Sequence, residues 1–241
     1  DREVTVNELT DEWQSRINYT PLNQDRKSYL ERIDGIVYGP NPRQGYVAGL
    51  HFYHPDLEFQ FPVPDNWQVI NTANTVMIVS PEKDAIIQFG FVNATSPGAA
   101  ADKFVADAGT GVQRRESSRV NGFSAEIVES ESHGQTRMVS YFIQKERSVY
   151  AFHGYSLIEK FAGFASSFAR VMTGFDKVTD PVVLSKQPER LRIERAPKAG
   201  TLESVLGEMG VPSSRTAEFA RLNGRAATER IEKGELLKVI R

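Results

Sequence analysis

Residues 54–67 read HPDLEFQFPVPDNW, and in the portion LEFQFPV, 57–63, apolar side chains alternate with other residues. This period of two is typical of a strand that buries one face. Pro64-Asp65-Asn66 then predicts a turn before Trp67. The strand begins where a helical pattern upstream ends. We therefore expect a domain of the α+β class to open at residue 56.

The chain before this strand, residues 1–55, is predicted to be a helical lead-in followed by a shaped loop. Thr10-Asp11-Glu12 offers an N-terminal cap, and a second helix is expected from about Asn23 to Arg32. Asp34-Gly35 would end that helix. The segment 32–45 then holds three glycines and two prolines, which indicates an ordered turn-rich loop. Two short helices bury little surface by themselves, so the lead-in must pack on something else.

Residues 56–179 are predicted to form an antiparallel sheet with packed helices. Asn121-Gly122 is a strong hairpin signal, and Ser96-Pro97 is typical of a helix start. Ser156 and Glu159 match a capping box, which predicts that Ser156 begins a second helix. Strands are expected at 57–63, 75–80, 85–92, about 112–119, 123–131, 136–145 and 148–155, and the helices at 97–108 and after 156.

The remainder is predicted to be a linker, 180–189, and a small βααβ domain, 190–241. Pro181 and Pro188 interrupt any period in the linker. Two helices, 202–209 and 215–222, follow a strand at 191–195 and precede a strand at 236–240. A unit of about 50 residues is close to the lower size limit for independent folding, so its two terminal strands must pair.

Composition restricts the class of protein. With 40% hydrophobic and 25% charged residues, the chain has the composition of a globular domain. It contains no cysteine, which excludes disulfides and thiolate chemistry and fits a periplasmic or secreted protein. The net charge of −2 gives no basis for nucleic acid binding, and no run of about 18 apolar residues predicts a transmembrane segment.

Three parts of the chain resemble known families. Residues 32–45 followed by His54-Pro55-Asp56-Leu57-Glu58-Phe59 resemble the region after the peptidase domain in bacterial HtpX-like gluzincin zinc metallopeptidases (peptidase family M forty-eight). Residues 57–178 look like a PsbP-like sandwich. The tail is similar to a LysM module, in Gly200-Thr201-Leu202, in Asn223-Gly224 and in the sequence KGELL at 233–237.

The first resemblance implies a zinc protease whose catalytic part is not in this sequence. The His-Glu-x-x-His helix of those enzymes does not occur here, so we expect it to precede Asp1. This chain would then be a non-catalytic accessory region in the periplasm or outside the cell. It needs no cofactor of its own, zinc belongs to the missing domain, and the upstream peptidase domain is its partner.

The resemblances also suggest two sets of site residues. In a LysM-like tail, the loops at Gly200-Thr201 and Asn223-Gly224 flank a sugar groove, with peptidoglycan as the ligand, although both loops also serve as helix caps and could have that role alone. The turn-rich loop at 32–45 would contact the catalytic domain. Its residues could equally serve only to shape the chain where the domain 56–179 begins. The glycan-binding candidates are Gly200, Thr201, Leu202, Asn223 and Gly224, and the docking candidates are Asp34, Gly35, Arg43, Gln44 and Gly45.

One cluster could bind a metal ion, since His51, His54 and Asp56 lie within six residues. On a strand, however, positions three apart face opposite sides, so only a turn would bring the two imidazoles together. We favour a structural role for them.

The family resemblances lead to two candidate functions for the chain. It is an accessory region of a zinc metalloprotease or, alternatively, a free-standing cell-envelope binding protein whose tail binds peptidoglycan.

Overall fold

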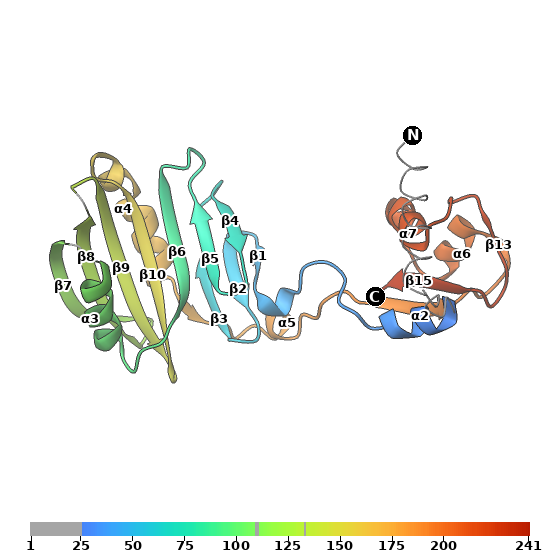
Figure 1. Ribbon diagram of the computed structural model, residues 1–241, viewed down its shortest axis with the longest axis horizontal. Helices are drawn as coiled ribbons and strands as arrows, with labels where there is room; N and C mark the ends of the chain where they lie inside the picture. Colours follow the sequence, from blue (N-terminus) through green and yellow to red (C-terminus); the bar gives the residue numbers. More distant parts are fainter. Residues whose placement is uncertain (1–25, 109–110, 133) are drawn as a thin grey trace, which may run out of the picture. The chain divides into compact units, whose positions relative to one another are not determined.

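The computed structural model describes residues 26–108, 111–132 and 134–241. They form two compact units (Figure 1). Of the described residues, one unit comprises 26–39 together with Glu189–Arg241, and the other comprises Pro40–Pro188. The helix expected near Thr10 lies outside the described residues. Among the helices that the model describes, none is long and apolar enough to cross a membrane.

The larger unit contains two antiparallel sheets with helices packed on them, which confirms the predicted α+β class. Its four-stranded sheet has the order β1-β2-β3-β11, and its seven-stranded sheet has the order β4-β5-β6-β10-β9-β8-β7. The strands are β1 (Tyr46–Ala48), β2 (His51–His54), β3 (Phe59–Pro62), β4 (Gln68–Asn71), β5 (Thr75–Val79), β6 (Ala85–Val92), β7 (Gly111–Val120), β8 (Phe123–Ser132), β9 (Thr136–Lys145), β10 (Ser148–Leu157) and β11 (Asp176–Lys177).

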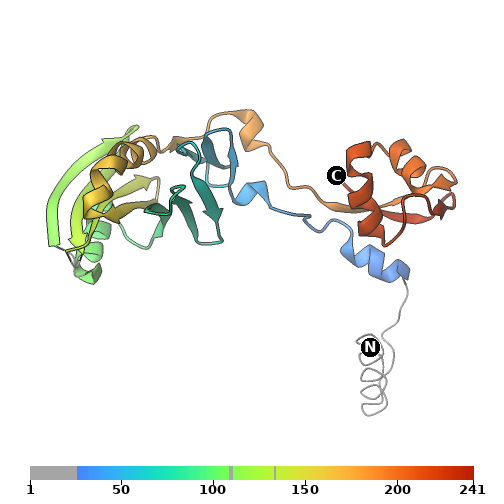
Figure 2. The ribbon, with the colours of Figure 1, turned by 90° about the horizontal axis from the view of Figure 1, so that it is seen from above.

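The main core lies on one face of the seven-stranded sheet. Helix α4 (Ile158–Thr173) and the four-stranded sheet both pack into it, and Phe61, Phe152 and Phe168 are fully buried there. Figure 2 shows α4 in gold beside the strands of this unit. Gly154 on β10 permits the close approach of α4, since a Cβ at this position would lie 2.7 Å from Met172 Cε.

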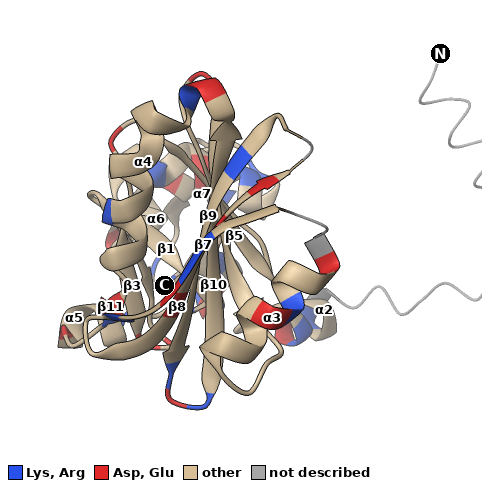
Figure 3. Ribbon diagram, turned by 90° about the vertical axis from the view of Figure 1, so that its left-hand side faces the viewer, with Lys and Arg blue, Asp and Glu red and all other residues tan. Residues whose placement is uncertain are grey.

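The opposite face is covered in part by helix α3 (Pro97–Ala108), so that α3 and α4 lie on opposite sides of the sheet (Figure 3). Ser96 accepts a hydrogen bond from the backbone N–H of Ala99 at 3.1 Å, as the predicted helix start requires. Arg115 joins helix to sheet, because it donates to Asp102 on α3 and to Glu126 on β8, each at 2.6 Å. A second, smaller core forms under α3.

The smaller unit has the βααβ order that the sequence predicts. Its outer strands, β12 (Leu191–Arg195) and β15 (Leu236–Ile240), pair with each other in antiparallel register. Helices α6 (Leu202–Glu208) and α7 (Thr216–Asn223) pack on them. The remaining regular elements are a two-stranded ladder of β13 (Gly200–Thr201) and β14 (Arg230–Ile231), and a short helix η2 (Ser213–Arg215).

Residues 26–39 belong to this smaller unit. Helix α2 (Arg26–Ile33) packs on β12, and its Leu30 is only 2% exposed. The chain after α2 then runs beside β12: Gly35 donates to the carbonyl of Leu191 at 2.7 Å, and Tyr38 donates to that of Glu189 at 2.8 Å. The unit is therefore built from two stretches that are far apart in the sequence, and the predicted lead-in is divided between the two units.

Several local predictions need correction. Ser156 does not cap α4, because β10 extends through Leu157 and the Ser156 hydroxyl donates to the carbonyl of Leu157. The strand predicted from residue 57 begins at Phe59, since Glu58 has a positive φ of 51° and belongs to the preceding turn. The predicted linker contains a short helix, α5 (Pro181–Leu184), whose Val183 is buried. The short strands β1, β2 and β4 had not been predicted.

Candidate functional site

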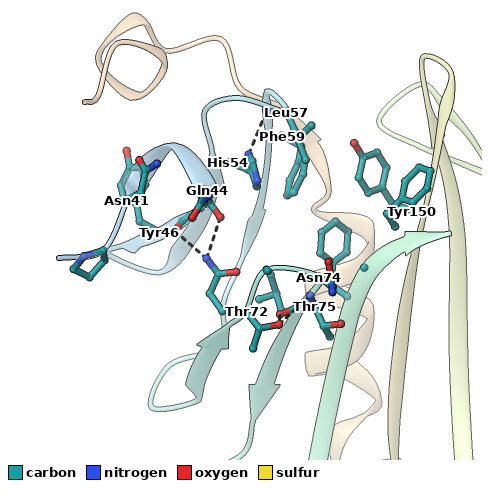
Figure 4. A pocket seen from close by; sticks show the side chains of 18 residues that line it. Asn41, Gln44, Tyr46, His54, Leu57, Phe59, Thr72, Asn74, Thr75 and Tyr150 are labelled. Atoms are coloured by element: carbon teal, nitrogen blue, oxygen red, sulfur yellow. Dashed lines mark hydrogen bonds between the residues drawn. The ribbon is translucent and has the colours of Figure 1, made fainter. Parts of the chain in front are cut away.

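A cavity of about 760 Å³ opens in the larger unit (Figure 4). One side is formed by the four-stranded sheet and the loop before it, and the other by the β4–β5 turn with the adjoining ends of β6 and β10. Its volume lies within the ~300–1,000 Å³ range of small-molecule sites. The residues that line it are Pro40, Asn41, Gln44, Gly45, Tyr46, His54, Leu57, Phe59, Asn71, Thr72, Ala73, Asn74, Thr75, Val76, Phe89, Gly90, Phe91 and Tyr150.

The loop on the first side has a defined shape. Asn41 Oδ1 accepts from the backbone N–H of Arg43 at 3.0 Å and so begins the single turn η1 (Pro42–Gln44). Gly45 ends it with a φ of +103°, and a Cβ there would lie 2.4 Å from Phe52 Cζ. The glycine at position 45 is therefore required by both backbone conformation and space.

Asn71, on β4, holds this loop against the seven-stranded sheet. Its side-chain amide donates to the carbonyl of Gln44 at 3.1 Å and to that of Gly45 at 3.0 Å, as the dashed lines in Figure 4 show. Arg43 anchors the outer side of the loop, since it donates to Asp56 Oδ1 at 2.7 Å and to the Leu184 carbonyl at 2.7 Å. The loop is thus fixed at both of its sides before any ligand arrives.

The deep part of the cavity is aromatic. Phe59, Phe89 and Tyr150 are almost fully buried, and Phe89 and Tyr150 stack with their ring planes 7° apart. Burial raises the pKa of the Tyr150 hydroxyl. Phe91 differs from these residues because it is 63% exposed while lining the same cavity. The site therefore combines a buried aromatic floor with one aromatic ring that is open to solvent.

His54 is the histidine of this site, and its pKa is lowered. The cause is mainly its burial, partly opposed by the nearby carboxylate of Asp56 and reinforced by Arg43. Its Nδ1 atom accepts from the backbone N–H of Leu57 at 3.2 Å. Because the pKa is lowered from an ordinary value near 6.5, the imidazole is neutral at pH 7.

The cluster of His51, His54 and Asp56 does not form a metal site. His51 is exposed, whereas His54 turns toward the cavity, and Asp56 is paired with Arg43. Within the ranges that the structure describes, no three His, Cys, Asp or Glu side chains are grouped as metal ligands. A structural role for these residues stays a prediction.

The five docking candidates fall in different units. Arg43, Gln44 and Gly45 shape the cavity loop of the larger unit. Asp34 and Gly35 lie in the smaller unit, where Asp34 Oδ1 accepts from the backbone N–H of Ile193 at 2.9 Å. Gly35 accepts from Arg190 Nη1 at 2.7 Å. All of them thus have contacts within their own unit, and docking to a further domain stays a prediction.

The glycan-binding candidates lie at helix ends of the smaller unit. Thr201 Oγ1 accepts from the backbone N–H of Ser204 at 3.3 Å and caps α6, and Leu202 is buried beneath it. Gly224 ends α7 in the left-handed conformation, with a φ of 66°. The Asn223 amide donates to the Phe219 and Lys238 carbonyls and accepts from the Lys238 N–H at 2.8 Å. These contacts stabilise the unit, and sugar binding here stays a prediction.

Most residues of the cavity are not among the candidates that the sequence predicts. Gln44, Gly45 and His54 are such candidates, whereas the β4–β5 turn at 71–75, Phe91 and Tyr150 are not. The composition of that turn, Asn-Thr-Ala-Asn at 71–74, was a usable signal. The aromatic residues gave no such signal, because on a strand they fit the alternation of apolar and polar side chains that any half-buried strand shows.

Comparison with known proteins gives fold-level likeness only. No protein-family model and no curated protein matches the chain. Among solved structures, the chain is similar to a cyanobacterial PsbP from Synechocystis, at a TM-score of 0.44 and 12% identity over 55% of this chain and 98% of that one. It is also similar to LpqN of Mycobacterium tuberculosis, whose description mentions cell envelope biogenesis, at a TM-score of 0.36 and 12% identity over 50% and 83%. A protein of unknown function from Pseudomonas aeruginosa matches at 0.33 and 12% over 54% and 90%.

Proposed function

We propose that this chain is a non-catalytic binding region of an extracytoplasmic bacterial protein, and that the cavity of the larger unit is its binding site. The observation that carries this proposal is the cavity itself, which is preformed by the Asn71 hydrogen bonds and lined by neutral polar and aromatic groups. Such a lining suits reversible recognition of a ligand. The chain contains no cysteine, which is compatible with a periplasmic or secreted protein.

Filling the cavity tests this proposal. Ala73 lines the site and is exposed, so Ala73→Trp should occupy part of the space without disturbing the core. Immobilised native chain should retain material from a bacterial cell-envelope fraction, and Ala73→Trp should retain much less. Gln113→Trp, on the exposed strand β7, is the matched control. Equal retention by native chain and Ala73→Trp would show that the cavity is not the binding site.

The proposed parent protein is a zinc-dependent metallopeptidase. The support is the resemblance of residues 32–45 and 54–59 to the segment that follows the peptidase domain in HtpX-like enzymes. In this proposal, zinc and hydrolysis belong to an upstream domain, and this chain places that domain or its substrate. The gene sequence before Asp1 tests it: a His-Glu-x-x-His helix is expected there, and stoichiometric zinc with casein hydrolysis by this chain alone would overturn it.

A second candidate function is peptidoglycan binding by the smaller unit, as in a free-standing envelope protein. It is favoured by the βααβ arrangement, which brings Gly200-Thr201 and Asn223-Gly224 to helix ends. Sedimentation with purified peptidoglycan separates the two sites. Retention that survives Ala73→Trp but is lost in Thr201→Ala, with an otherwise native NMR spectrum, would assign binding to the smaller unit.

A further inference from the structure

We propose that the cavity of the larger unit takes an uncharged carbohydrate, with a sugar ring packed on Phe91 and its hydroxyl groups bonded by the side-chain amides of Gln44 and Asn74. This inference rests on the proposed function, since it names the chemical class of the ligand for the same site. Four properties of the described residues lead to it. The cavity has an uncharged lining, an exposed Phe91 ring, two side-chain amides without hydrogen-bond partners, and nearby backbone groups that already have partners.

No residue that lines the cavity is an acid or a base with a fixed charge, and the nearby Lys186 ammonium lies over the Tyr46 ring, 4.0 Å from its centroid. None of the eighteen lining residues shown in Figure 4 is an Asp, Glu, Lys or Arg, and His54 is neutral at pH 7 because its burial lowers its pKa. The nearby Arg43 and Asp56 neutralise each other. A phosphate or carboxylate would have to draw Lys186 away from the Tyr46 ring to gain an ionic partner, and an ammonium group would find no carboxylate among the lining residues, so either would lose its hydration at a net cost. An uncharged ligand is therefore favoured.

The aromatic side chains at the rim provide a surface for an apolar face. Phe91 is 63% exposed, which makes it the most exposed phenylalanine of a unit that buries most of its aromatic rings. Its ring makes a T-shaped contact with Tyr150, with 6.3 Å between the ring centroids, and most of its surface remains exposed. Tyr46, on the other side of the cavity, already has Lys186 Nζ over its ring at 4.0 Å. Phe91 is thus the available platform, and the C–H face of a sugar ring can cover it.

Two side-chain amides that line the same cavity have no hydrogen-bond partner in the described chain. The side chains of Gln44 and Asn74 are exposed, and neither forms a hydrogen bond with any part of the chain that the structure describes. Each offers two N–H donors and a carbonyl acceptor. Neighbouring hydroxyl groups of a sugar can donate and accept at once, which matches an amide. A purely apolar ligand would leave these amides desolvated and unpaired.

The backbone around the site argues against an extended peptide. In the β4–β5 turn, the Thr72 N–H already donates to the Thr75 carbonyl at 2.9 Å, and the Thr72 hydroxyl accepts from the Thr75 N–H at 3.2 Å. On the opposite wall, Asn71 occupies the carbonyls of Gln44 and Gly45. A peptide that adds as a strand needs a row of free backbone groups. In the β4–β5 turn and at Gln44 and Gly45 these backbone groups are already engaged, whereas the side-chain amides of Gln44 and Asn74 have no partner in the described chain and can meet sugar hydroxyl groups.

NMR titration of the ¹⁵N-labelled full chain tests the inference. The probes are three uncharged tetrasaccharides, chitotetraose, cellotetraose and maltotetraose, with tetragalacturonate as the anionic probe and an acetylated, amidated Ala-Ser hexapeptide as the neutral peptide. At least one uncharged saccharide should shift the side-chain NH₂ signals of Gln44 and Asn74 and the backbone signal of Phe91. Phe91→Ala and the double variant Gln44→Ala/Asn74→Ala should each weaken that binding at least tenfold. Gln113→Ala, which removes an exposed amide far from the cavity, should not.

Each other outcome overturns the inference in a distinguishable way. Cavity shifts with the peptide alone, or with tetragalacturonate as strongly as with the neutral sugars, would reject the uncharged carbohydrate but keep the cavity as a binding site. Saccharide shifts confined to residues 189–241 would move the sugar site to the smaller unit. If none of the five probes shifts a cavity signal, the carbohydrate assignment is wrong, and the envelope-retention experiment with Ala73→Trp decides separately whether the cavity binds anything.

Discussion

The Asp34 carboxylate accepts a hydrogen bond of 2.9 Å from the backbone N–H of Ile193, a residue 159 positions further along the chain. The bond lies at the end of helix α2, where Gly35 also pairs with the carbonyl of Leu191. Together with buried Leu30, these contacts attach residues 26–38 to strand β12. The smaller unit is therefore larger than the predicted domain 190–241, and a chain that starts after Pro188 would expose the surface that α2 covers.

We expect Asp34→Ala to destabilise the smaller unit by about 1 kcal/mol, because the Ile193 N–H loses its partner in a partly exposed position. Leu30→Ala should cost more, roughly 2–5 kcal/mol, because the side chain is 2% exposed. Hydrogen exchange of the β12 and β15 amides measures both effects in the full chain. Glu31→Ala, whose side chain is 63% exposed, is the control. Unchanged exchange in Leu30→Ala would show that α2 is not part of the unit.

A second prediction concerns pH. His153 lies under α3, where its ring stacks on Phe104 at 5.1 Å and its Nδ1 lies 2.8 Å from Ser140 Oγ. Burial lowers its pKa to about 4 from an ordinary 6.5. Between pH 6.5 and 4 the unfolded chain therefore takes up a proton that the folded chain does not. As the pH is lowered from 6.5 to 4, the free energy of unfolding should therefore decrease by roughly 3 kcal/mol in total. Above pH 6.5 this histidine should not affect it.

Urea unfolding of the larger unit at several pH values measures this effect. Lys103 and Asp107 of α3 line the same hollow as His153. Variants that remove either charge therefore separate the effect of neighbouring charges on the His153 pKa from the effect of burial. His153→Asn keeps a hydrogen-bonding group toward Ser140 but does not titrate, and it should flatten the decline between pH 6.5 and 4. His51→Asn, at an exposed position, should leave the decline in place. A decline that persists in His153→Asn must come from other groups.

Two glycines of the larger unit should respond in opposite directions to the same substitution. A Cβ at Gly154 would lie 2.8 Å from Phe168 Cγ and 2.7 Å from Met172 Cε, so Gly154→Ala forces α4 away from β10 and should cost about 1–3 kcal/mol. Gly163 is inside α4 with open space around it, and Gly163→Ala should stabilise by roughly 0.5–1 kcal/mol. Urea midpoints compare them. Equal effects would mean that α4 does not pack on β10 at this distance.

Much of the fold could be predicted because its elements have clear periods. Strand β6 and helix α3 begin and end where the sequence predicts, since turn residues mark their ends. Strand β4 has only four residues, Gln68–Asn71, too few to show an alternation. The attachment of Asp34 to Ile193 has no local signal at all, because it joins residues 159 positions apart. Periodic patterns reveal only relationships between residues that are close in the sequence. The smaller unit depends on contacts between residues that are far apart in the sequence.

The candidate site was harder to predict for a related reason. Gln44, Asn74, Phe91 and Tyr150 come from separate segments, and each is unremarkable where it stands in the sequence. Gly45 was noted as part of a shaped loop, yet its role depends on Phe52, which fills the space where its Cβ would lie. Only the resemblance of residues 32–45 points to site residues of the larger unit, through Arg43, Gln44 and Gly45, whereas the resemblance of the tail points to the smaller unit. Only the arrangement of the two sheets brings the cavity residues together.

The last prediction concerns the hydrogen bonds that shape the cavity. Asn71→Ala removes both bonds to the loop, at 3.1 Å to Gln44 O and 3.0 Å to Gly45 O. The site is exposed, so the stability cost should be small, about 1 kcal/mol. The loop, however, loses its attachment to β4, and the affinity for any cavity ligand should fall because the loop must then be ordered on binding. Relaxation of the Gln44 and Gly45 backbone amides should show increased motion in Asn71→Ala but not in the control Asn93→Ala, which removes an exposed amide elsewhere in the unit. An Asn71→Ala loop as rigid as the native one would mean that Arg43, through Asp56 and Leu184, holds it unaided.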